Sequence, residues 1–386
     1  MSEQFTPRMG LTVQHRALVL AAVAALACAT TGALTARAKF PGHGTGQAAD
    51  EWPGNPLVQA GVRWDAGWYE QIARDGYWYQ EGKQSPVAFF PGYPLAIRAL
   101  SAVGVNRFLA GELISLVCGL VAIFLFARWA QTVTDARTAL VATLLLIVYP
   151  FSFFLYGVMY SDALFLMLVV GAFYALERDR VWLATLLGIL ATGTRPVAPA
   201  LVLGLLVRRL EKRYRAGERF TALDFVPVLS TTGMALYMGY LWWRFGDPLA
   251  FAHTQAAPGW DHTPTLRTWL KITWFETVST TQSRWVALRL VGHMLLAVYA
   301  LILAIPTRKY LGWGYAVFIA AVVGIPAISS KDMHGLGRYV IAAFPCFVTL
   351  ALMMKGRRYM TALWVAASAL ILLFLAASFG ATAFVA

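Results

Sequence analysis

The sequence predicts an all-α polytopic membrane protein, a bundle of about eleven transmembrane helices, on three observations. Hydrophobic residues make up 59% of the 386-residue chain, and the mean hydropathy is +0.60. Only 13% of the residues are charged, against about 25% in soluble globular proteins. Apolar runs recur along the whole chain, separated by short turns that carry Lys and Arg. We therefore expect residues 1–386 to form a single integral membrane domain.

The first apolar run is expected to be a retained transmembrane helix over residues 16–35. Its Ala-rich sequence and the Thr35–Ala38 stretch also resemble a cleaved signal peptide, but many further apolar runs follow. Residues 36–106 are polar and rich in Gly and Pro at first, and we expect them to form the first extracytoplasmic loop. Residues 95–105 are too short for a crossing, so this long loop is expected to carry short interfacial helices.

Residues 107–244 are expected to hold transmembrane helices. The run 181–207 would be about 40 Å long as one straight helix, more than a hydrocarbon core of roughly 30 Å. Because Thr192–Pro196 interrupts it, we expect two shorter helices that meet at Arg195 and Pro196. The other crossings before the second large extracytoplasmic loop, residues 245–284, are expected near 107–128, 138–156, 160–177 and 222–243. The C-terminal helices, within residues 285–386, are expected near 285–305, 311–328, 337–354 and 360–384.

The distribution of charge sets the expected orientation. The net charge is +13, and 17 of the 32 basic residues lie in short turns of one face, together with only seven acidic residues. Because short loops rich in Lys and Arg stay in the cytoplasm, the N-terminus is expected to be cytoplasmic and the C-terminus extracytoplasmic. The protein is then a multi-pass protein of the cell (inner or plasma) membrane. Topology explains the positive charge, so no nucleic-acid partner is expected.

The same topology brings the polar segments to the extracytoplasmic face. Ionisable residues are costly at membrane depth, which makes those at the helix ends functional candidates. The segments are the loop of Asp65, the turn at Asp162, the helix break at Arg195, the loop containing Asp261, and Lys331–His334 with Arg338 beyond it.

Each candidate also has a structural alternative. Arg195 could satisfy carbonyl groups freed by the helix break, and Arg338 could be an anchor that extends to the interface. Asp162 could cap the helix that follows it. The aromatic residues around Asp65 could belong to an interfacial belt.

Several of these segments carry a family resemblance. Trp64–Tyr69 with Gly76 and Tyr77, followed by Ala88–Pro94, resembles the PIG-V-type mannosyltransferases, which belong to the GT-C superfamily of polyprenyl-phosphate-sugar-dependent membrane glycosyltransferases. Tyr160–Phe165 is similar to the family's Tyr-Ser/Thr-Glu-x-Leu-Phe element, with Asp162 where Glu is common. The elements Thr194–Pro196, Gly246–Leu249 and Arg338–Val340 also resemble the family.

The resemblance implies an inverting glycosyltransferase that moves a hexose, foremost mannose, from a polyprenyl-phosphate sugar to a lipid, glycan or protein acceptor on the extracytoplasmic face. Asp65 matches the first-loop aspartate that is catalytic in these enzymes, and it would take the proton of the acceptor hydroxyl. Direct displacement with a single base inverts the anomeric centre. No cofactor is expected, because the polyprenyl-phosphate sugar is itself the donor. No metal is expected either, since the sequence shows no metal-ligand spacing.

Two further sets of residues are expected to bind the substrates. Guanidinium groups offer fixed bidentate donors to a phosphate, and the expected donor phosphate-binding residues are Arg195, Arg338, Lys331 and His334. Aromatic rings would stack on sugar faces or form the wall of a lipid groove. The expected substrate-binding residues are Trp64, Trp68, Tyr69, Tyr93, Asp162 and Asp261.

Two other classes of protein fit part of the pattern. A transporter or lipid flippase also uses broken helices and buried arginines, but it should show internal repeats and ionisable residues near the bilayer midplane. No internal repeat is found in the sequence. A scaffold of a glycosylation complex would leave the loop motifs without a role. Turnover of a polyprenyl-phosphate sugar by the purified protein would separate the enzyme from both.

Overall fold

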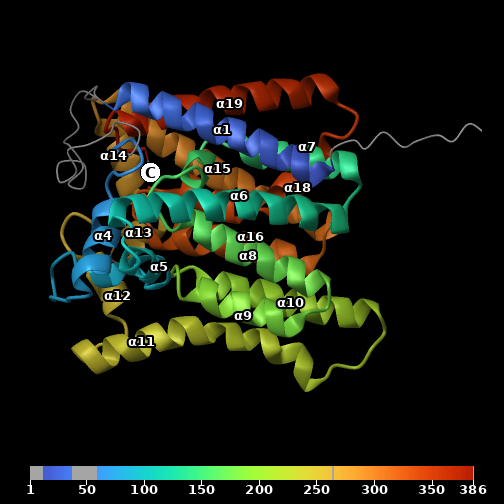
Figure 1. Cartoon of the computed structure of the whole chain (residues 1–386), viewed down its shortest axis with the longest axis horizontal. Helices are drawn as coiled ribbons and strands as arrows, with labels where there is room; N and C mark the ends of the chain where they lie inside the picture. The colour runs from blue at the N-terminus through green and yellow to red at the C-terminus, as the bar shows by residue number, and fades with distance from the viewer. Residues whose placement is uncertain (1–11, 37–58, 263–264, 386) are drawn as a thin grey trace, which may run out of the picture.

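The computed structural model describes residues 12–36, 59–262 and 265–385. These described residues form helices and loops and include no strand. Long helices lie side by side, and short helices gather at one end of the bundle (Figure 1). The predicted all-α class is therefore confirmed. Residues 37–58 of the predicted first loop lie outside the described residues.

Twelve of the described helices make up the bundle. They are α1 (Val13–Thr35), α6 (Arg107–Val133), α7 (Ala136–Ile147), α8 (Asp162–Glu177), α9 (Val181–Thr192), α10 (Ala198–Arg215), α11 (Thr232–Phe245), α15 (Arg284–Tyr310), α16 (Trp313–Ser329), α17 (Leu336–Ala342), α18 (Pro345–Met353) and α19 (Arg358–Gly380). The short helices are α4 (Ala66–Asp75), α5 (Gly92–Ala102), α12 (Ala250–His253), α13 (Leu266–Trp269) and α14 (Ile272–Thr280). The 3₁₀ helices are η1 (Pro86–Ala88), η2 (Ser152–Leu155), η3 (Ala222–Thr231) and η4 (Thr254–Ala256).

Four of the described helices, α1, α6, α15 and α19, are long and apolar enough to cross a membrane, and α17 with α18 could form a fifth, bent span. Helices α7, α9 and α16 are apolar but shorter. The chain is thus a multi-pass membrane protein by the length and composition of its helices. The count of about eleven crossings stays a prediction.

Two breaks between helices of the bundle lie next to a proline. As predicted, the run 181–207 is divided, since α9 ends at Thr192 and α10 begins at Ala198 beyond Pro196. The run expected to cross near 337–354 is divided into α17 and α18, which meet at an angle of 82° just before Pro345, so it could cross only as a bent span. The break lies at Ala343, whose ψ of 43° is not helical. Pro345 then stands in the first turn of α18, where its missing N–H leaves no helical hydrogen bond unmade.

Small residues allow the first and last helices to pack closely. A Cβ atom added to Gly380 of α19 would lie 2.5 Å from the carbonyl oxygen of Gly32 in α1. The hydroxyl of Thr35 donates a hydrogen bond of 2.8 Å to the carbonyl of Ala377. Close backbone approach and interhelical hydrogen bonds replace the hydrophobic driving force that lipid cannot supply. Helices α1 and α19 therefore form one edge of the bundle (Figure 1).

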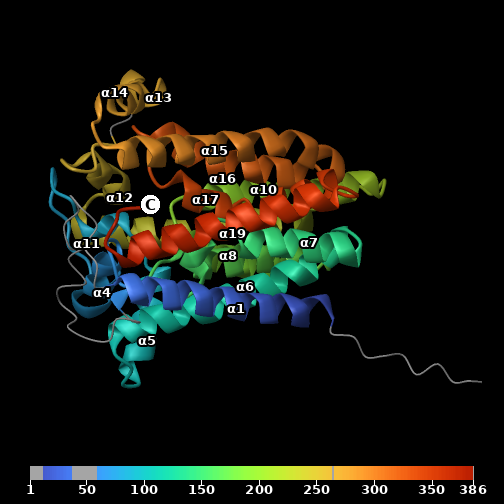
Figure 2. The ribbon, with the colours of Figure 1, turned by 90° about the horizontal axis from the view of Figure 1, so that it is seen from above.

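We call the end of the bundle that bears α4, α5 and α12–α14 the loop end. The last described residues also lie there, whereas α1 begins at the opposite end (Figures 1 and 2). The basic connection between α10 and η3 and the one between α18 and α19 lie at that opposite end. The polar segments expected to converge thus do share one end of the molecule.

Candidate active site

Asp65 is placed by α4, the short helix that follows it. The buried residues of α4 are Ala66, Tyr69, Glu70, Ile72 and Ala73, spaced as on one face of an amphipathic helix. The side chain of Glu70 is 3% exposed and forms ion pairs with Arg74 at 3.1 Å and with Arg107 at 2.7 Å. Because Arg107 is the first residue of α6, this pair fixes α4, and with it Asp65, against the bundle.

The backbone around Asp65 is held on both sides. The N–H group of Asp65 donates a hydrogen bond of 3.2 Å to the hydroxyl of Tyr160. The guanidinium of Arg63 donates one of 3.1 Å to the carbonyl of Gly380 at the end of α19. Between them, Trp64 adopts a φ of 53°, which is unfavourable for a bulky side chain and persists only where the surroundings enforce it. The loop therefore presents Asp65 in one defined orientation.

Four charged side chains of alternating sign lead inward from Asp65, and we call them the charge row. The guanidinium of Arg338 donates to the Asp65 carboxylate at 3.4 and 3.5 Å. The same guanidinium lies 3.7 Å from the carboxylate of Asp162, which also accepts a hydrogen bond from Arg195. Side-chain exposure falls from 30% at Asp65 to 13% at Arg338 and 2% at Asp162. The row thus begins at an accessible carboxylate and ends in the protein interior.

The charge row joins segments that are distant in the sequence. Arg338 lies in the first turn of α17, Asp162 is the first residue of α8, and Arg195 follows the end of α9. The guanidinium of Arg338 also lies over the rings of Tyr160 and Phe154, at 4.8 and 5.2 Å from their centroids. Such cation–π contacts hold a guanidinium in place without using its N–H donors.

The electrostatics of Asp65 reflect two opposing influences. Removal from water disfavours the ionised carboxylate and raises the pKa of Asp65 above its usual range, whereas the nearby charge of Arg338 works in the opposite direction. The negative charge of Asp162 adds to the upward shift of this pKa. A carboxylate with a raised pKa is a stronger base than a free aspartate, which suits proton transfer near neutral pH.

The structure decides between the alternatives for the inner members of the row. Asp162 makes no capping hydrogen bond at the start of α8; its carboxylate pairs with Arg195 instead. Arg195 is buried and directed at that carboxylate. Arg338 faces two carboxylates, whereas an interfacial anchor would extend away from them. The capping and anchoring alternatives are therefore wrong. Arg195 reaches Asp162, and no contact between Arg195 and Asp65 is found within the described residues.

Three aromatic rings meet on α4, one from the helix itself and two from the loops that follow η1 and η4. The half-buried ring of Trp68 stacks on Phe89 with 5.9 Å between centroids, and it lies 5.9 Å from the ring of Trp260. Phe89 and Trp260 complete the group at 6.1 Å. Trp68 is therefore the predicted aromatic residue whose partly exposed ring could face a ligand from this side.

Tyr69 and Tyr93 lie deeper than a sugar-stacking role requires. Tyr69 is 6% exposed, and its hydroxyl shares a hydrogen bond of 2.9 Å with Ser161. Tyr93 is fully buried, and its hydroxyl donates to the carbonyl of Gly111 at 2.7 Å. The two rings meet edge to face at 4.9 Å. In this structure Tyr93 supports Tyr69 and offers no face to a substrate.

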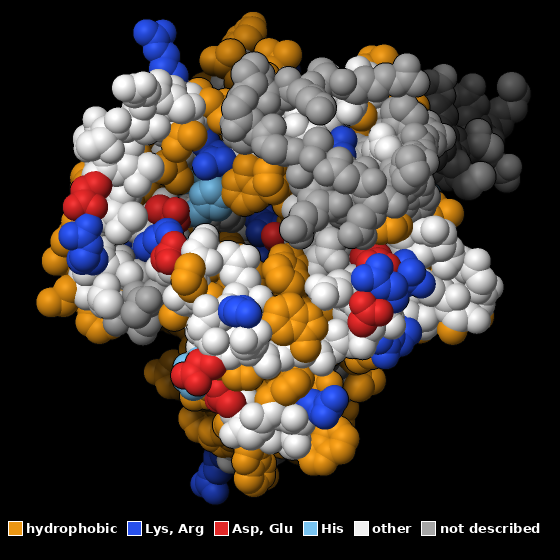
Figure 3. Space-filling model, turned by 90° about the vertical axis from the view of Figure 1, so that its left-hand side faces the viewer, with side chains coloured by type: hydrophobic (Ala, Val, Ile, Leu, Met, Phe, Trp, Pro, Cys, Tyr) orange, Lys and Arg blue, Asp and Glu red, His pale blue; other side chains and the backbone are white. Residues whose placement is uncertain are grey.

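The remaining predicted residues lie outside the charge row. The ammonium of Lys331 lies 2.9 Å from the carboxylate of Asp261, and this pair lowers the pKa of Asp261. The ring of His334 stacks on Phe384 at 4.6 Å, and Trp64 meets Phe384 edge to face at 4.7 Å. Figure 3 shows the loop end, which is hollowed near its centre where basic, acidic and His side chains gather.

Sequence reasoning missed three residues of the site. Tyr160 accepts the hydrogen bond from the Asp65 backbone and contacts Arg338, yet only its neighbour Asp162 was predicted to bind a substrate. Its place in the Tyr160–Phe165 element was a usable signal. Phe154 beneath Arg338 and Phe384 against Trp64 lie in segments without a motif, so only the folded structure reveals them.

Together these groups can move a proton and hold an anion. An accessible carboxylate can act as a general base, and a guanidinium beside it can stabilise developing negative charge. Among the described residues, no three His, Cys, Asp or Glu side chains are grouped so that they could hold a metal ion.

The family described as Mannosyltransferase (PIG-V) matches residues 46–216 of the chain. The predicted family resemblance is confirmed. The matched stretch includes Asp65, Asp162 and Arg195, whereas Arg338 lies beyond it.

Relatives by sequence match the chain over a limited length. The chain is 39% identical over 146 residues to the GPI alpha-1,6-mannosyltransferase 2 of Cricetulus griseus and 37% identical over 145 residues to that of Homo sapiens. Each match covers 34% of this chain and 28% of the relative. Among solved structures, the Archaeoglobus fulgidus oligosaccharyltransferase in its apo form aligns with 96% of this chain and 56% of its own, with 12% identity and a TM-score of 0.48.

Proposed function

We propose that the chain is an inverting membrane glycosyltransferase. It would transfer a hexose, foremost mannose, from a polyprenyl-phosphate sugar to a hydroxyl of a lipid, glycan or protein acceptor on the extracytoplasmic face. The observation that carries the proposal is the contact of 3.4 Å between the Asp65 carboxylate and the Arg338 guanidinium. The reaction needs a base for the proton of the acceptor hydroxyl and a cation for the phosphate that leaves, and this contact brings one of each together. The similarity to PIG-V mannosyltransferases supports the class of reaction.

In the proposed reaction, the acceptor hydroxyl oxygen attacks the anomeric carbon of the donor. Asp65 accepts the hydroxyl proton, and the bond between the anomeric carbon and the phosphate oxygen breaks with its electron pair going to the phosphate. One displacement without a covalent intermediate inverts the anomeric centre. Protonation of Asp65 removes its charge and so weakens its pair with Arg338. The guanidinium becomes available to the phosphate as the phosphate gains charge.

Arg338 is suited to this change of partner. A guanidinium has five N–H donors in a planar fork that matches a phosphate. The Nε–H of Arg338 is buried and makes no hydrogen bond with the described residues. Its position is kept by Asp162 at 3.7 Å and by the ring of Tyr160. We propose that Asp162 and Arg195 position Arg338, and that direct phosphate contact by Arg195 would first require its ion pair with Asp162 to open.

The other predicted contacts belong to the periphery of the proposed site. Trp68 is the best placed to stack on a sugar, since its ring is partly exposed beside α4. Lys331 and His334 would approach the donor phosphate from the loop that precedes α17. Asp261 would act through its pair with Lys331.

The experiment that tests the proposal uses the purified chain in nanodiscs, with polyprenyl-phosphate mannose labelled in the sugar and a total membrane lipid and glycan extract as the acceptor source. We expect labelled product from the wild type and a rate lower by about 10²–10⁴-fold from Asp65→Asn, which keeps the size of the side chain and removes the base.

Asp75→Asn is the matched control. Asp75 ends the same helix, is 54% exposed and pairs only with Arg74 among the described residues, so its rate should equal that of the wild type. Equal rates for Asp65→Asn and wild type would remove Asp65 from the role of base. Movement of labelled donor across liposomes without product would favour a transporter and contradict the enzyme.

A further inference from the structure

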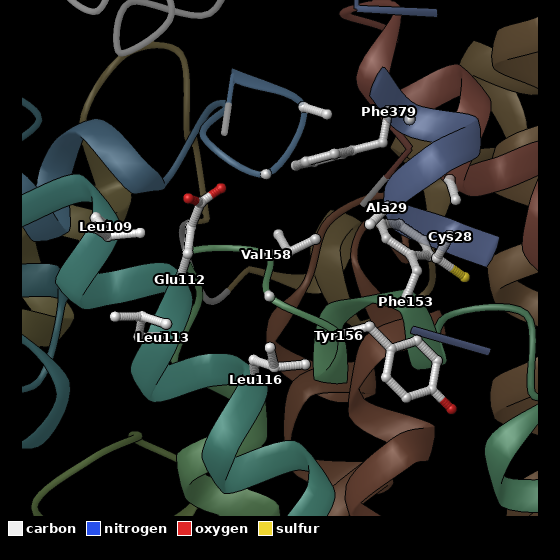
Figure 4. Close-up of a pocket in the computed structure, with 15 residues that line it drawn as sticks. Cys28, Ala29, Leu109, Glu112, Leu113, Leu116, Phe153, Tyr156, Val158 and Phe379 are labelled. Atoms are coloured by element: carbon white, nitrogen blue, oxygen red, sulfur yellow. The ribbon is translucent and has the colours of Figure 1, made fainter. Parts of the chain in front are cut away.

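A pocket separate from the charge row opens beside the segment that leads to Asp65. Its volume is about 230 Å³, and it is walled by α1, α6, α19 and the backbone near Gly61 and Gly157. Figure 4 shows Glu112 of α6 on one side and Cys28 of α1 with Phe379 of α19 on the other. The lining is otherwise apolar, and none of the described residues that line it is basic.

Glu112 is the feature that packing alone does not explain. Its half-buried carboxylate faces the pocket and forms no hydrogen bond or ion pair with the described residues, although carboxylates drawn away from water are normally paired. Gly61 makes room for it, since a Cβ atom added there would lie 2.4 Å from Oε1 of Glu112. An ionisable side chain in a transmembrane helix is a functional candidate by default.

The pocket lies close to the loop-end termini of three helices. Glu112 is five residues into α6, about 8 Å from the helix start at 1.5 Å per residue. Cys28 is seven residues, or about 10 Å, from the end of α1, and Ala376 is about 6 Å from the end of α19. The walls therefore belong to the outermost turns of three helices at the loop end, where a lipid can enter from the side.

The chemistry of the pocket selects a neutral group with hydroxyls. A phosphate would meet a carboxylate without a cation to balance it. An ammonium group would pair only with the ionised form of Glu112, whereas a hydroxyl can donate to a carboxylate and can also pair with a carboxylic acid. The apolar walls fit the alkyl part of the same molecule.

The pocket and the charge row share one stretch of backbone. The carbonyl of Gly61 accepts a hydrogen bond of 3.0 Å from the N–H of Met159, and the N–H of Asp65 is bonded to Tyr160. Gly61 and Asp65 are four positions apart, so their Cα atoms lie at most about 14 Å apart. The segment that lines the pocket is therefore the one that carries Asp65.

On these grounds we infer that the Glu112 pocket binds the acceptor, and that the acceptor is a lipid with an uncharged, hydroxyl-bearing headgroup such as a glycolipid sugar. The inference deepens the proposed function and rests on it. The donor, with its anionic phosphate, is assigned to the arginine side of Asp65, and the acceptor to the opposite side.

The test measures binding independently of turnover. Octyl α-D-mannopyranoside, octyl phosphate and octylammonium share a chain and differ in headgroup, and their binding to the purified chain in nanodiscs can be followed by native mass spectrometry. We expect octyl mannoside to bind more tightly than the other two. Glu112→Leu should weaken the binding of octyl mannoside about tenfold or more, since hydrogen bonds to charged groups are among the strongest. Glu218→Leu, an exposed glutamate at the opposite end, should leave it unchanged.

A second variant covers the case in which Glu112→Leu does not fold. Leu113→Trp adds bulk at the pocket wall from a position that is 39% exposed, and it should also weaken binding of octyl mannoside. The inference is overturned if either folded variant binds octyl mannoside as the wild type does, or if the three headgroups bind alike. Asp65→Asn should bind octyl mannoside normally while it loses transfer. A wild type that binds octyl mannoside selectively but transfers no mannose contradicts only the proposed reaction, and a wild type that transfers mannose but binds the three headgroups alike contradicts only the pocket.

Discussion

The carboxylate of Asp65 accepts two hydrogen bonds from the guanidinium of Arg338, although 273 residues separate them in the sequence. The contact forms because α4 and α17 both begin at the loop end of the bundle. It places the proposed base and the proposed anion-binding group side by side. The chemistry proposed for the chain depends on the exchange of partners at this contact.

Arg338 should matter through its geometry as well as its charge. Arg338→Gln removes both, and we expect the ratio kcat/KM for polyprenyl-phosphate mannose to fall by about 10²–10³-fold, as when an oxyanion donor is lost. Arg338→Lys keeps the charge without the planar fork and should recover part of that loss. Steady-state kinetics in nanodiscs measure both. Arg267→Gln, at a 58% exposed arginine of the loop end, is the control and should match the wild type. A Lys variant no better than Gln would argue against a role for the charge.

The pH dependence should report the environment of Asp65. A base must be ionised, so kcat/KM should fall as the pH drops through its pKa. Because burial raises the pKa of Asp65, the acid limb should lie above the value of about 3.9 for a free aspartate. Asp162→Asn removes a negative neighbour, which favours the ionised form, and should move the limb to lower pH. A limb that stays in place in this variant would show that another group titrates.

The inner ion pair should show strong energetic coupling. Asp162→Ala alone would leave the buried Arg195 without its carboxylate partner, and breaking a buried pair in this way costs about 3–5 kcal/mol. The double variant Asp162→Ala with Arg195→Met should unfold at a higher temperature than Asp162→Ala, because no buried charge is left alone. Thermal unfolding in detergent measures the four proteins of the cycle. Additive losses of stability would contradict the coupling.

Close helix packing should be sensitive to a single methyl group. A Cβ atom added to Gly119 of α6 would lie 1.9 Å from the carbonyl oxygen of Leu155, so Gly119→Ala should destabilise the protein by about 1–3 kcal/mol. Gly292 in α15 has no atom within 4 Å of such a Cβ. Gly292→Ala should therefore be neutral or stabilising by up to about 1 kcal/mol, because alanine favours a helix. Unfolding temperatures of the two variants provide the comparison.

The sequence predicted the charged members of the site because charge is costly near a membrane. Asp65, Asp162, Arg195 and Arg338 stand out at helix ends in a chain with few charges, and the structure brings all four together. Which charges pair could not be predicted, because pairing depends on contacts across hundreds of residues. The ion pair of Asp162 with Arg195 emerges only from the fold.

The orientation of aromatic residues was harder to predict. Trp68 and Tyr93 are both aromatic and both flank the predicted site, yet one ring is partly exposed and the other is buried. The hydroxyl of Tyr93 can be buried because it donates a hydrogen bond to the carbonyl of Gly111. The sharp bend between α17 and α18, in contrast, had a signal in the sequence. That signal was Pro345 inside the run 337–354, but the run is long enough for one crossing and was therefore assigned as one.

The contacts of the Asp65 loop with the far end of the chain have a consequence for biosynthesis. Arg63 is bound to the carbonyl of Gly380, and Trp64 rests on Phe384. Chains are made and inserted from the N-terminus, so this loop waits on its side of the bilayer while the intervening helices enter the membrane one after another. Asp65 can reach its final orientation only when translation has supplied Gly380 and Phe384, so the proposed site is completed last.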